Sequence, residues 1–192
     1  MDEWALLRDD DGGPEAYEAI VREHYQPAFH FARQILGDEQ KAEDVVQRAF
    51  VNIYVTRERH EARALFRTFL FRVVTNLSIN ELNRRAGPAL ISDILPEDGE
   101  RAAATFVDAS SPRPEAGVEA EELGGMIRAG LMKLPPKHRA ALYLREYQAM
   151  SYAGISEVLE ASLSEVKIWI HRGRAALQDI LRPYLDRGES IK

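Results

Sequence analysis

The chain of 192 residues contains no cysteine, which excludes a disulfide framework and a thiolate metal site. It also lacks a charge-free apolar run of about 18 residues, the length that a helix needs to cross a bilayer. Its first residues, MDEWALLRDDDGG, are acidic where a secretory signal peptide is basic and then apolar. We therefore expect a protein of the cytoplasm.

Catalytic motifs are missing as well, since the sequence has no HExxH, no GxSxG and no phosphate-binding GxxxxGK. The nearest histidines, His24 and His30, are six residues apart, which turns a helix by about 240° and separates their faces. Glu39, Glu43 and Asp44 could share a cation, but a carboxylate row on an exposed helix more commonly faces solvent or a protein partner. We expect no enzyme activity, no cofactor, no metal and no small-molecule substrate.

The net charge of -6 at first argues against a nucleic-acid partner, because binding to DNA depends on basic side chains. The distribution of charge reverses this impression. Residues 57–85 carry seven basic and three acidic side chains, and residues 133–182 carry eight and five. Residues 1–56 and 93–123 are strongly acidic. The local field decides where a polyanion can bind, so the two basic segments are candidate DNA-binding regions.

Helical periodicity dominates the sequence, and no stretch alternates long enough to predict a strand, so the fold class is all-α. The first long helix begins near Pro14, and Pro27 should kink or divide it near Gln26. Gly37 ends this helix, and Asp38 caps a second one that runs to about residue 55. A third helix is predicted over residues 64–85. The inner positions predicted for the second helix are Ala42, Val45, Val46, Ala49, Phe50, Ile53 and Tyr54. Those predicted for the third are Leu65, Phe69, Val73, Asn76, Leu77, Asn80 and Leu82.

Residues 88–118 combine Pro, Gly, Ala, Ser and acidic side chains with little periodicity, which is typical of a flexible acidic linker. A compact domain rarely contains so long a stretch without regular structure. We therefore predict two small helical domains, residues 1–87 and residues 119–192, on either side of the linker.

The second domain is predicted to contain four helices. After one over residues 119–132, Pro135 and Pro136 begin another, and Ser151 caps a short third helix. Ser162 opens the last helix, with Glu165 three residues later forming a capping box. Pro183 is predicted to end it. The inward positions are Ala140, Ala141, Leu142, Leu144 and Tyr147, followed by Val166, Ile170, Ala175, Leu177 and Ile180. A short helix, a turn and a longer basic helix form the helix-turn-helix arrangement.

The last helix is a candidate reader of duplex DNA, because basic, hydroxyl and imidazole side chains can contact base edges in the major groove. The alternative is a solvated basic helix that packs on its own domain. The sequence leaves the role of Trp169 open: its side chain contacts DNA or a partner, or it packs in the core. The outward positions of this helix are Ser164, Glu165, Lys167, Ile168, His171 and Arg172, with Arg174 placed for the phosphate backbone.

The segment RERHEARALFRTFLFR interleaves basic and aromatic residues, a combination that suits single-stranded DNA. The alternative is that its aromatic rings pack in the core. We favour the core for Phe69 and leave Phe66 and Phe71 open.

Three segments in their order resemble the sigma-70 family, group IV, the extracytoplasmic-function (ECF) class of RNA polymerase sigma factors. They are YEAIVREHYQPAFHFARQILGDEQKAEDVVQRAFVNIY, FRTFLFRVVTNLSINELNRR and LPPKHRAALYLREYQAMSYAGISEVLEASLSEVKIWIHRGRAAL. The resemblance implies a region 2 domain that binds core polymerase and melts the minus-ten element. It also implies a region 4 domain that reads the minus-thirty-five element. The implied partners are core RNA polymerase, through its clamp coiled coil and flap, promoter DNA and an anti-sigma factor.

The resemblance also assigns residues to each contact. Core polymerase binding falls to Glu43, Asp44, Val46, Gln47 and Phe50. The minus-ten contacts fall to Arg63, Phe66, Arg67, Arg72, Asn76, Arg84 and Arg85, with residues 57–64 and the start of the third helix capturing a flipped base. The minus-thirty-five contacts fall to Ser164, Glu165, Lys167, Ile168, His171, Arg172 and Arg174.

The sequence departs from the family pattern at four places. Thr75 and Asn80 stand where a basic residue and Asp are usual, and Glu160 stands where the turn usually has Gly. The pair Ile168-Trp169 replaces a pair that is commonly small or polar and basic. These departures leave the promoter sequence open. Two other functions remain as alternatives: a conventional helix-turn-helix regulator that acts without core polymerase, and an adaptor that sequesters another factor.

Overall fold

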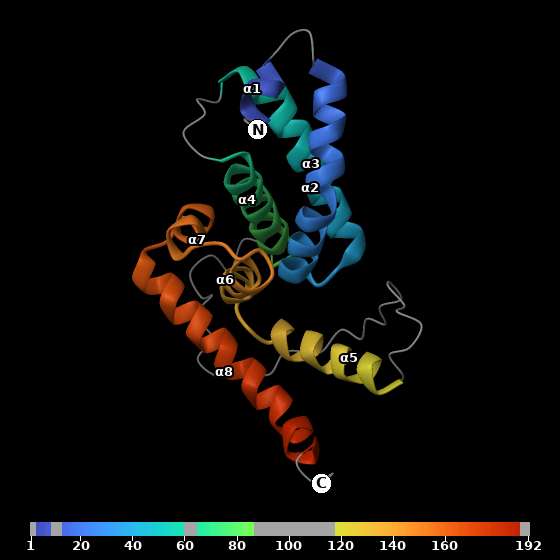
Figure 1. Cartoon of the computed structure of the whole chain (residues 1–192), viewed down its shortest axis with the longest axis vertical. Helices are drawn as coiled ribbons and strands as arrows, with labels where there is room; N and C mark the ends of the chain where they lie inside the picture. The colour runs from blue at the N-terminus through green and yellow to red at the C-terminus, as the bar shows by residue number, and fades with distance from the viewer. Residues whose placement is uncertain (1–2, 9–12, 60–64, 87–117, 189–192) are drawn as a thin grey trace.

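The computed structural model describes residues 3–8, 13–59, 65–86 and 118–188, and every regular element in these ranges is helical, which confirms the all-α prediction. The elements are α1 (Glu3–Arg8), α2 (Gly13–Leu36), α3 (Glu39–Thr56), the 3-10 turn η1 (Arg57–Arg59), α4 (Phe66–Ala86), α5 (Val118–Met132), α6 (Pro136–Glu146), α7 (Tyr152–Leu159) and α8 (Leu163–Gly188). Figure 1 shows α1–α4 grouped in one half and α5–α8 in the other. The predicted linker, apart from its last residue, lies outside the described residues. Within those ranges no helix is long and apolar enough to cross a membrane.

The corner between α2 and α3 forms as the local sequence predicts. Gly37 has a φ of +68°, a left-handed conformation that glycine adopts without a steric penalty. Asp38 then accepts a hydrogen bond from the backbone N–H of Lys41 at 3.1 Å. This cap satisfies one of the free N–H groups at the start of α3.

Two helices continue past a proline: Pro27 does not divide α2, which was one of the two outcomes predicted for it, and Pro183 does not end α8 as predicted. Pro27 lies inside α2, and α8 continues past Pro183 to Gly188. The ring of proline fixes φ near its helical value, so the helix can continue with the loss of one backbone hydrogen bond. In α2 this loss is offset by the complete burial of Ala28 and Phe31 just beyond the proline.

The buried face of α4 is shifted by about one residue from the predicted one. Leu65, Asn76 and Asn80 are exposed, although the periodicity placed them inside. Phe69, Val73, Leu77 and Leu82 are only partly buried. The buried side chains are Phe66, Leu70, Phe71, Val74, Thr75, Ser78 and Glu81. Because α4 carries apolar residues on several sides, the pattern alone did not define one inner face.

The second half forms largely as predicted. Ser151 caps α7 by accepting from the backbone N–H of Gly154 at 3.1 Å. Ala140, Ala141, Leu142, Leu144, Val166 and Ile170 are buried. Tyr147 is exposed instead, because α6 ends at Glu146 and the chain turns toward α7. Ala175 is also exposed, whereas Leu177 and Ile180 of the same predicted face are partly buried.

The two halves pack against each other. Helix α6 contacts α2, and α7 contacts α4, so the second half lies on one side of the first (Figure 1). Buried residues of both halves belong to one hydrophobic cluster. The helices that carry the two basic segments are therefore neighbours.

Candidate nucleic-acid interface

Helix α7, a short turn and α8 form a helix-turn-helix (Figure 1). The turn includes Glu160, whose φ of +49° is in the left-handed region that favours glycine. The Oγ of Ser162 accepts from the backbone N–H of Glu165 at 3.2 Å, and the Glu165 carboxylate accepts from the backbone N–H of Ser162 at 2.8 Å. The predicted capping box is confirmed, and it fixes the start of α8.

The first turns of α8 present one continuous exposed face. Ser164, Lys167, Ile168, His171 and Arg172 follow the helical spacing of three and four residues, and all five are exposed. Ile168, an apolar side chain, is 49% exposed in the middle of this face. Basic groups and an imidazole around an apolar centre can bind guanine edges and contact a thymine methyl group. This face therefore has the chemistry to read the major groove.

Two of the predicted contact residues already have partners in the protein. The Glu165 carboxylate also accepts from the Ser162 hydroxyl at 2.7 Å, and these hydrogen bonds lower the pKa of Glu165. Arg174 donates to the Glu146 carboxylate from Nε at 2.9 Å and from Nη2 at 2.7 Å. A phosphate at Arg174 must therefore compete with Glu146, whereas Glu165 serves as part of the helix cap.

Trp169, whose role the sequence left open, packs against its own half of the protein. Its ring stacks on the imidazole of His138 with centroids 5.9 Å apart, and the Lys137 ammonium lies 5.6 Å from the ring centroid. The Trp169 side chain is partly buried. It thereby connects α8 to the beginning of α6, behind the exposed face.

The aromatic rings of α4 are mainly core residues. Phe66 is 1% exposed, with its ring edge-on to Trp4 of α1 at 5.3 Å, and Phe71 is equally buried. Phe69 is partly exposed and also contacts Trp4, at 5.2 Å. The burial of Phe66 corrects its assignment as a DNA contact, because its ring is not accessible to a base. Leu65, which the sequence pattern placed inside, is instead the exposed apolar side chain just before α4.

The middle of α4 presents polar groups toward solvent. Asn76 is exposed, and the partly exposed Arg72 lies with its guanidinium 5.2 Å from the centroid of the Phe69 ring. A planar cation and an amide on one helix suit the phosphates and base edges of a single strand. Arg63 and the side chain of Arg85 lie outside the described residues.

Arg67, at the start of α4, is held by the other half of the protein. Its Nη2 donates to the backbone carbonyl of Gln148 at 2.9 Å and also to the Gln148 side-chain Oε1. This contact could not be predicted from the sequence, because the two residues are 81 positions apart.

Helix α3 carries a second exposed surface. Val46 and Phe50, predicted to contact polymerase, are 0% and 4% exposed and belong to the core. A side chain that packs in the core is not available to a partner helix, so the structure corrects both assignments. The exposed apolar side chains of α3 are Val51 and Val55, which the helical periodicity did not single out.

The polar residues that were predicted to contact polymerase are exposed on this α3 surface. Glu43, Asp44 and Gln47 are exposed, and Gln47 donates from Nε2 to the Glu43 carboxylate at 3.3 Å. These three side chains and the two valines follow the helical spacing of one face. An exposed stripe of α3, formed by Glu43, Asp44, Gln47, Val51 and Val55, therefore combines acidic, amide and apolar groups.

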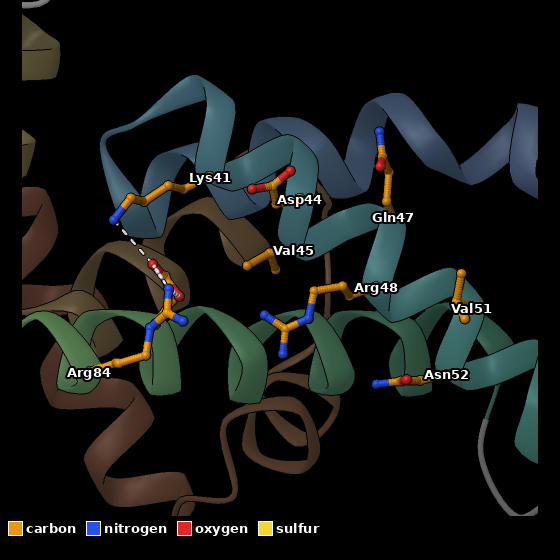
Figure 2. Close-up of a pocket in the computed structure, with 9 residues that line it drawn as sticks. Lys41, Asp44, Val45, Gln47, Arg48, Val51, Asn52 and Arg84 are labelled. Atoms are coloured by element: carbon orange, nitrogen blue, oxygen red, sulfur yellow. Dashed lines mark hydrogen bonds and ion pairs between the residues drawn. The ribbon is translucent and has the colours of Figure 1, made fainter.

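A groove of about 510 Å³ lies between α3 and α4, next to this stripe (Figure 2). At one end of the groove Glu81 pairs with Lys41 at 3.1 Å and with Arg84 at 2.8 Å. The hydrogen bond from Lys41 is the main cause of the lowered pKa of Glu81. Arg84, a predicted DNA contact, is thus already paired. The groove is lined by Lys41, Asp44, Val45, Gln47, Arg48, Val51, Asn52, Glu81 and Arg84.

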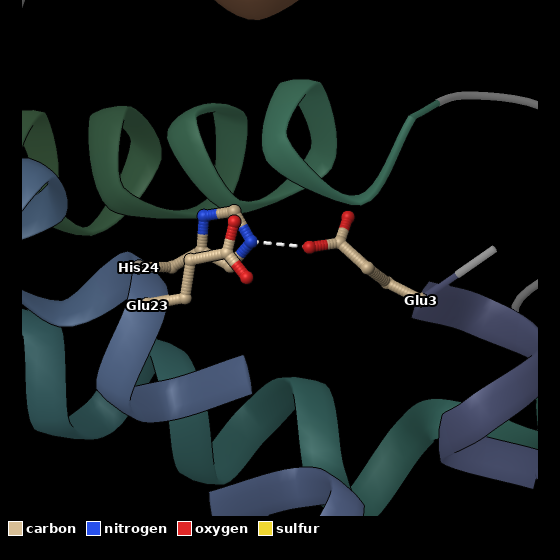
Figure 3. A group of neighbouring side chains, drawn as sticks. All are labelled: Glu3, Glu23 and His24. Atoms are coloured by element: carbon tan, nitrogen blue, oxygen red, sulfur yellow. Dashed lines mark hydrogen bonds and ion pairs between the residues drawn. The ribbon is translucent and has the colours of Figure 1, made fainter. Parts of the chain in front are cut away.

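Glu3, Glu23 and His24 bring their possible metal-ligand atoms within 4.8 Å of one another (Figure 3). The Nε2 atom of His24 is hydrogen-bonded to the Glu3 carboxylate, and this hydrogen bond connects α2 to α1. Glu39 and the carboxylates of the α3 stripe do not form such a group within the described residues.

Comparisons with known proteins identify relatives along most of the chain. The Sigma-70 region 2 family matches residues 20–87, and the Sigma-70, region 4 family matches residues 125–177. The ECF RNA polymerase sigma factor SigW of Bacillus subtilis is 30% identical over 172 residues, which cover 89% of this chain and 91% of the relative. The ECF RNA polymerase sigma factor SigE of Mycolicibacterium smegmatis is 31% identical over 90% of this chain, and this match spans 64% of the relative's length.

Two solved structures have a similar fold. One is CnrH in complex with the cytosolic domain of CnrY, with a TM-score of 0.65 and 23% identity, covering 95% of this chain and 97% of that chain. The other is the sigma factor RpoE in complex with the anti-sigma factor NepR from Bartonella quintana, with a TM-score of 0.67 and 18% identity, covering 86% of this chain and 96% of that chain.

Proposed function

Because this chain belongs to the extracytoplasmic-function class, group IV, of the sigma-70 family of RNA polymerase sigma factors, we propose that it binds core polymerase, directs it to specific promoters and helps to melt the minus-ten element. The observation that carries the proposal is the exposed basic face of α8 in a helix-turn-helix, in the same chain as a second basic helix. Core polymerase supplies the catalysis, so the factor acts through binding and needs no cofactor.

Recognition of the minus-thirty-five element is assigned to the exposed face of α8. Lys167 and Arg172 can donate to guanine edges, His171 and Ser164 can make further hydrogen bonds, and Ile168 can contact a thymine methyl group. Arg174 is placed for a phosphate once it leaves Glu146, and Glu165 holds the helix start in position. Each good base contact contributes about 1–3 kcal/mol of discrimination.

Recognition and melting of the minus-ten element are assigned to α4 and residues 57–64. Arg72 and Asn76 are the accessible members on the middle of α4. Arg67 and Arg84 are available once their present partners are displaced, and Arg63 and Arg85 complete the basic set. Trapping an unstacked base offsets an unstacking cost of a few kcal/mol, which is how binding energy opens the duplex.

Core polymerase binding is assigned to the exposed α3 stripe. Glu43, Asp44 and Gln47 supply acidic and amide groups, while Val51 and Val55 supply apolar area that water otherwise covers. A mixed surface of this kind suits a partner helix that carries basic and apolar residues, such as the clamp coiled coil. The flap of the polymerase is the expected partner of the second half.

The same proposal includes a division of the chain into a region 2 domain over 1–87, an acidic linker over 88–118 and a region 4 domain over 119–192. It also includes a location in the cytoplasm. An anti-sigma protein is a further proposed partner. The likeness to a sigma factor that was solved with an anti-sigma factor supports this last point.

A pair of substitutions tests the role of α8. Lys167→Ala with Arg172→Ala should lower promoter-specific transcription by at least about ten-fold, because two base contacts are lost, while binding to core polymerase stays at the wild-type level. Arg182→Ala is the control, since Arg182 is an exposed arginine of the same helix paired with Asp179. Unchanged transcription in the double variant would contradict the assignment. A specific shift of duplex DNA by the protein alone would favour the conventional regulator.

A further inference from the structure

The short helix α1 is attached to α2 and α4 through aromatic rings and one hydrogen bond. Trp4 is 3% exposed, and its ring lies edge-on to those of Phe66 and Phe69, with centroids 5.3 and 5.2 Å apart. The Glu3 carboxylate is hydrogen-bonded to Nε2 of His24, whose ring lies 5.3 Å from that of Phe66 (Figure 3). A helix of six residues is not stable alone, so these contacts fix the position of α1.

The position of α1 is next to the segment that the proposed function assigns to base capture, residues 57–64. Helix α1 packs on η1, which begins this segment. Through Trp4 it also contacts Phe66, the first residue of α4, which follows the segment. Helix α1 therefore contacts the chain on both sides of the proposed capture segment.

Phe69 connects the buried Trp4 to the surface of α4. The Phe69 ring is partly exposed, and the guanidinium of Arg72 lies over it, 5.2 Å from the ring centroid. Residues three positions apart are neighbours on a helix, and a cation over a ring face is attracted to it. The three side chains thus form a chain of contacts from the core to the proposed minus-ten surface.

Arg72 differs from the two other arginines of α4 whose side chains are described. Arg67 donates to Gln148, and Arg84 donates to the Glu81 carboxylate. Among the residues that the structure describes, no hydrogen bond or ion pair engages Arg72, and its contact is with the ring. Contact with a ring face leaves the N–H donors of a guanidinium available to an acceptor.

A guanidinium held in this way is prepared for a DNA strand. A free arginine side chain samples many rotamers, and restricting it on binding costs entropy. Arg72 has lost part of this freedom before the strand arrives, so less affinity is lost on binding. Asn76, four residues further along the same face, is exposed and can contact the same strand.

We propose that Trp4 is a positioning residue for the melted minus-ten strand: it holds the Phe69 ring, and this ring holds the Arg72 guanidinium ready for a phosphate. This inference rests on the proposed function and extends it to the first helix of the chain. Trp4 is buried, so it acts through the other two side chains and does not itself touch the strand.

A double-mutant cycle separates positioning from simple packing. Holoenzyme formed with core polymerase is placed on a promoter fragment recovered from in vitro transcription, and permanganate reactivity of unpaired thymines measures opening of the minus-ten element. Trp4→Ala should lower the equilibrium constant for opening by about two- to five-fold, the contribution of a cation–π contact near the surface. In protein that already carries Arg72→Ala, Trp4→Ala should have no further effect. Fully additive losses would overturn the inference, because Trp4 would then act through core packing alone.

Further variants keep the test decisive if Trp4→Ala loses too much stability. Trp4→Phe retains a ring against Phe69 and should restore most of the opening, whereas Phe69→Leu should reproduce the loss with Trp4 still present. Leu7→Ala is the matched control, because Leu7 is a buried side chain of the same helix and has no ring. It should lower the melting temperature and leave opening at the wild-type level. An equal loss of opening in Leu7→Ala and Trp4→Ala would refute the positioning role.

The salt dependence of opening gives a second readout. Each phosphate contact with a single strand contributes about 0.7 to the slope of the logarithm of the binding constant against the logarithm of the salt concentration. Arg72→Ala should make this slope shallower by about that amount. Trp4→Ala should change it in the same direction, because a displaced guanidinium neutralises less phosphate charge. An unchanged slope in Trp4→Ala would contradict an action through Arg72.

The outcomes separate the two proposals. If holoenzyme with the wild-type protein opens no promoter, the proposed function fails and the positioning role fails with it. If the wild type opens promoters and Trp4→Ala either has no effect or adds fully to Arg72→Ala, the positioning role alone is refuted.

Discussion

The imidazole of His138 stacks on the indole of Trp169, with ring planes inclined by 28°. His138 is buried, and its Nδ1 atom has no hydrogen-bond partner among the described residues. Burial is the main cause of its lowered pKa, and the positive charge of Arg172 on α8 lowers the pKa further. Burial and the nearby cation therefore favour the neutral imidazole at this contact between α6 and α8.

This burial predicts that the stability of the second half falls in mild acid. The unfolded chain has a histidine pKa of about 6.5, so it binds a proton before the folded protein does as the pH falls. Stability should be fully present above about pH 6.5 and be lost progressively below it. Thermal denaturation between pH 7.5 and pH 5 should show a steeper loss in the wild type than in His138→Gln. His30→Gln, at an exposed position, is the control, and equal slopes for His138→Gln and the wild type would contradict the prediction.

The turn at Glu160 predicts a stabilising substitution. Its left-handed backbone, at φ of +49°, is unfavourable for a residue with a Cβ atom and favourable for glycine. Glu160→Gly should raise the free energy of unfolding by about 0.5–1 kcal/mol. Glu157→Gly, an exposed position inside α7, should lower it by about 1 kcal/mol. Chemical denaturation measures both changes, and a loss of stability in Glu160→Gly would show that the side chain stabilises the turn in another way.

Ser78 of α4 has a buried hydroxyl, and replacing this residue should not destabilise the fold. The Oγ of Ser78 is fully buried without a hydrogen-bond partner among the residues described, whereas the Oγ of Ser156 donates to the carbonyl of Ala161. Ser78→Ala should leave the free energy of unfolding unchanged or raise it by about 1 kcal/mol, because an unpaired polar group is removed. Ser156→Ala should lower it by about 1 kcal/mol. Equal destabilisation of both variants in a denaturant titration would contradict this difference.

Substitutions of two valines of α3 should have opposite effects on polymerase binding and on stability. Val51 is 60% exposed and Val46 is fully buried. Val51→Asp should leave the melting temperature almost unchanged and weaken binding to core polymerase by about ten-fold, because a charge enters an apolar contact. Val46→Ala should lower stability by about 1–3 kcal/mol and leave the affinity of the folded protein as it is. Gel filtration with core polymerase measures the binding, and thermal melts measure the stability. Unchanged binding of Val51→Asp would show that the polymerase contact lies elsewhere on the protein.

Local signals allowed much of the fold to be predicted from the sequence. Gly37 with Asp38, and Ser162 with Glu165, act over three or four residues, so their caps are independent of distant packing. The inner face of α4 was predicted wrongly because two different surfaces cover it. Its own half covers one side and α7 covers another, and a contact between residues some 80 positions apart leaves no periodic signal.

The candidate site was predictable to different degrees. The exposed face of α8 follows from residue type and spacing, and the structure leaves it accessible. On α3 the periodicity placed Val46 and Phe50 inside while the family resemblance assigned them to a partner, and one side chain cannot do both. The structure resolves this conflict in favour of the core. Arg139 of α6 donates to the backbone carbonyls of Gln34 and Ile35 at the end of α2, and this connection could not be predicted because these two acceptors are more than 100 residues away.

In vitro transcription with purified core polymerase and a library of genomic fragments, with and without this protein, shows whether the chain acts as a sigma factor. We expect discrete transcripts that appear only when the protein is present, and their start sites reveal the promoters that α4 and α8 read. If no transcripts appear and the protein does not co-elute with core polymerase, the sigma factor assignment is contradicted and the conventional DNA-binding regulator becomes the better explanation.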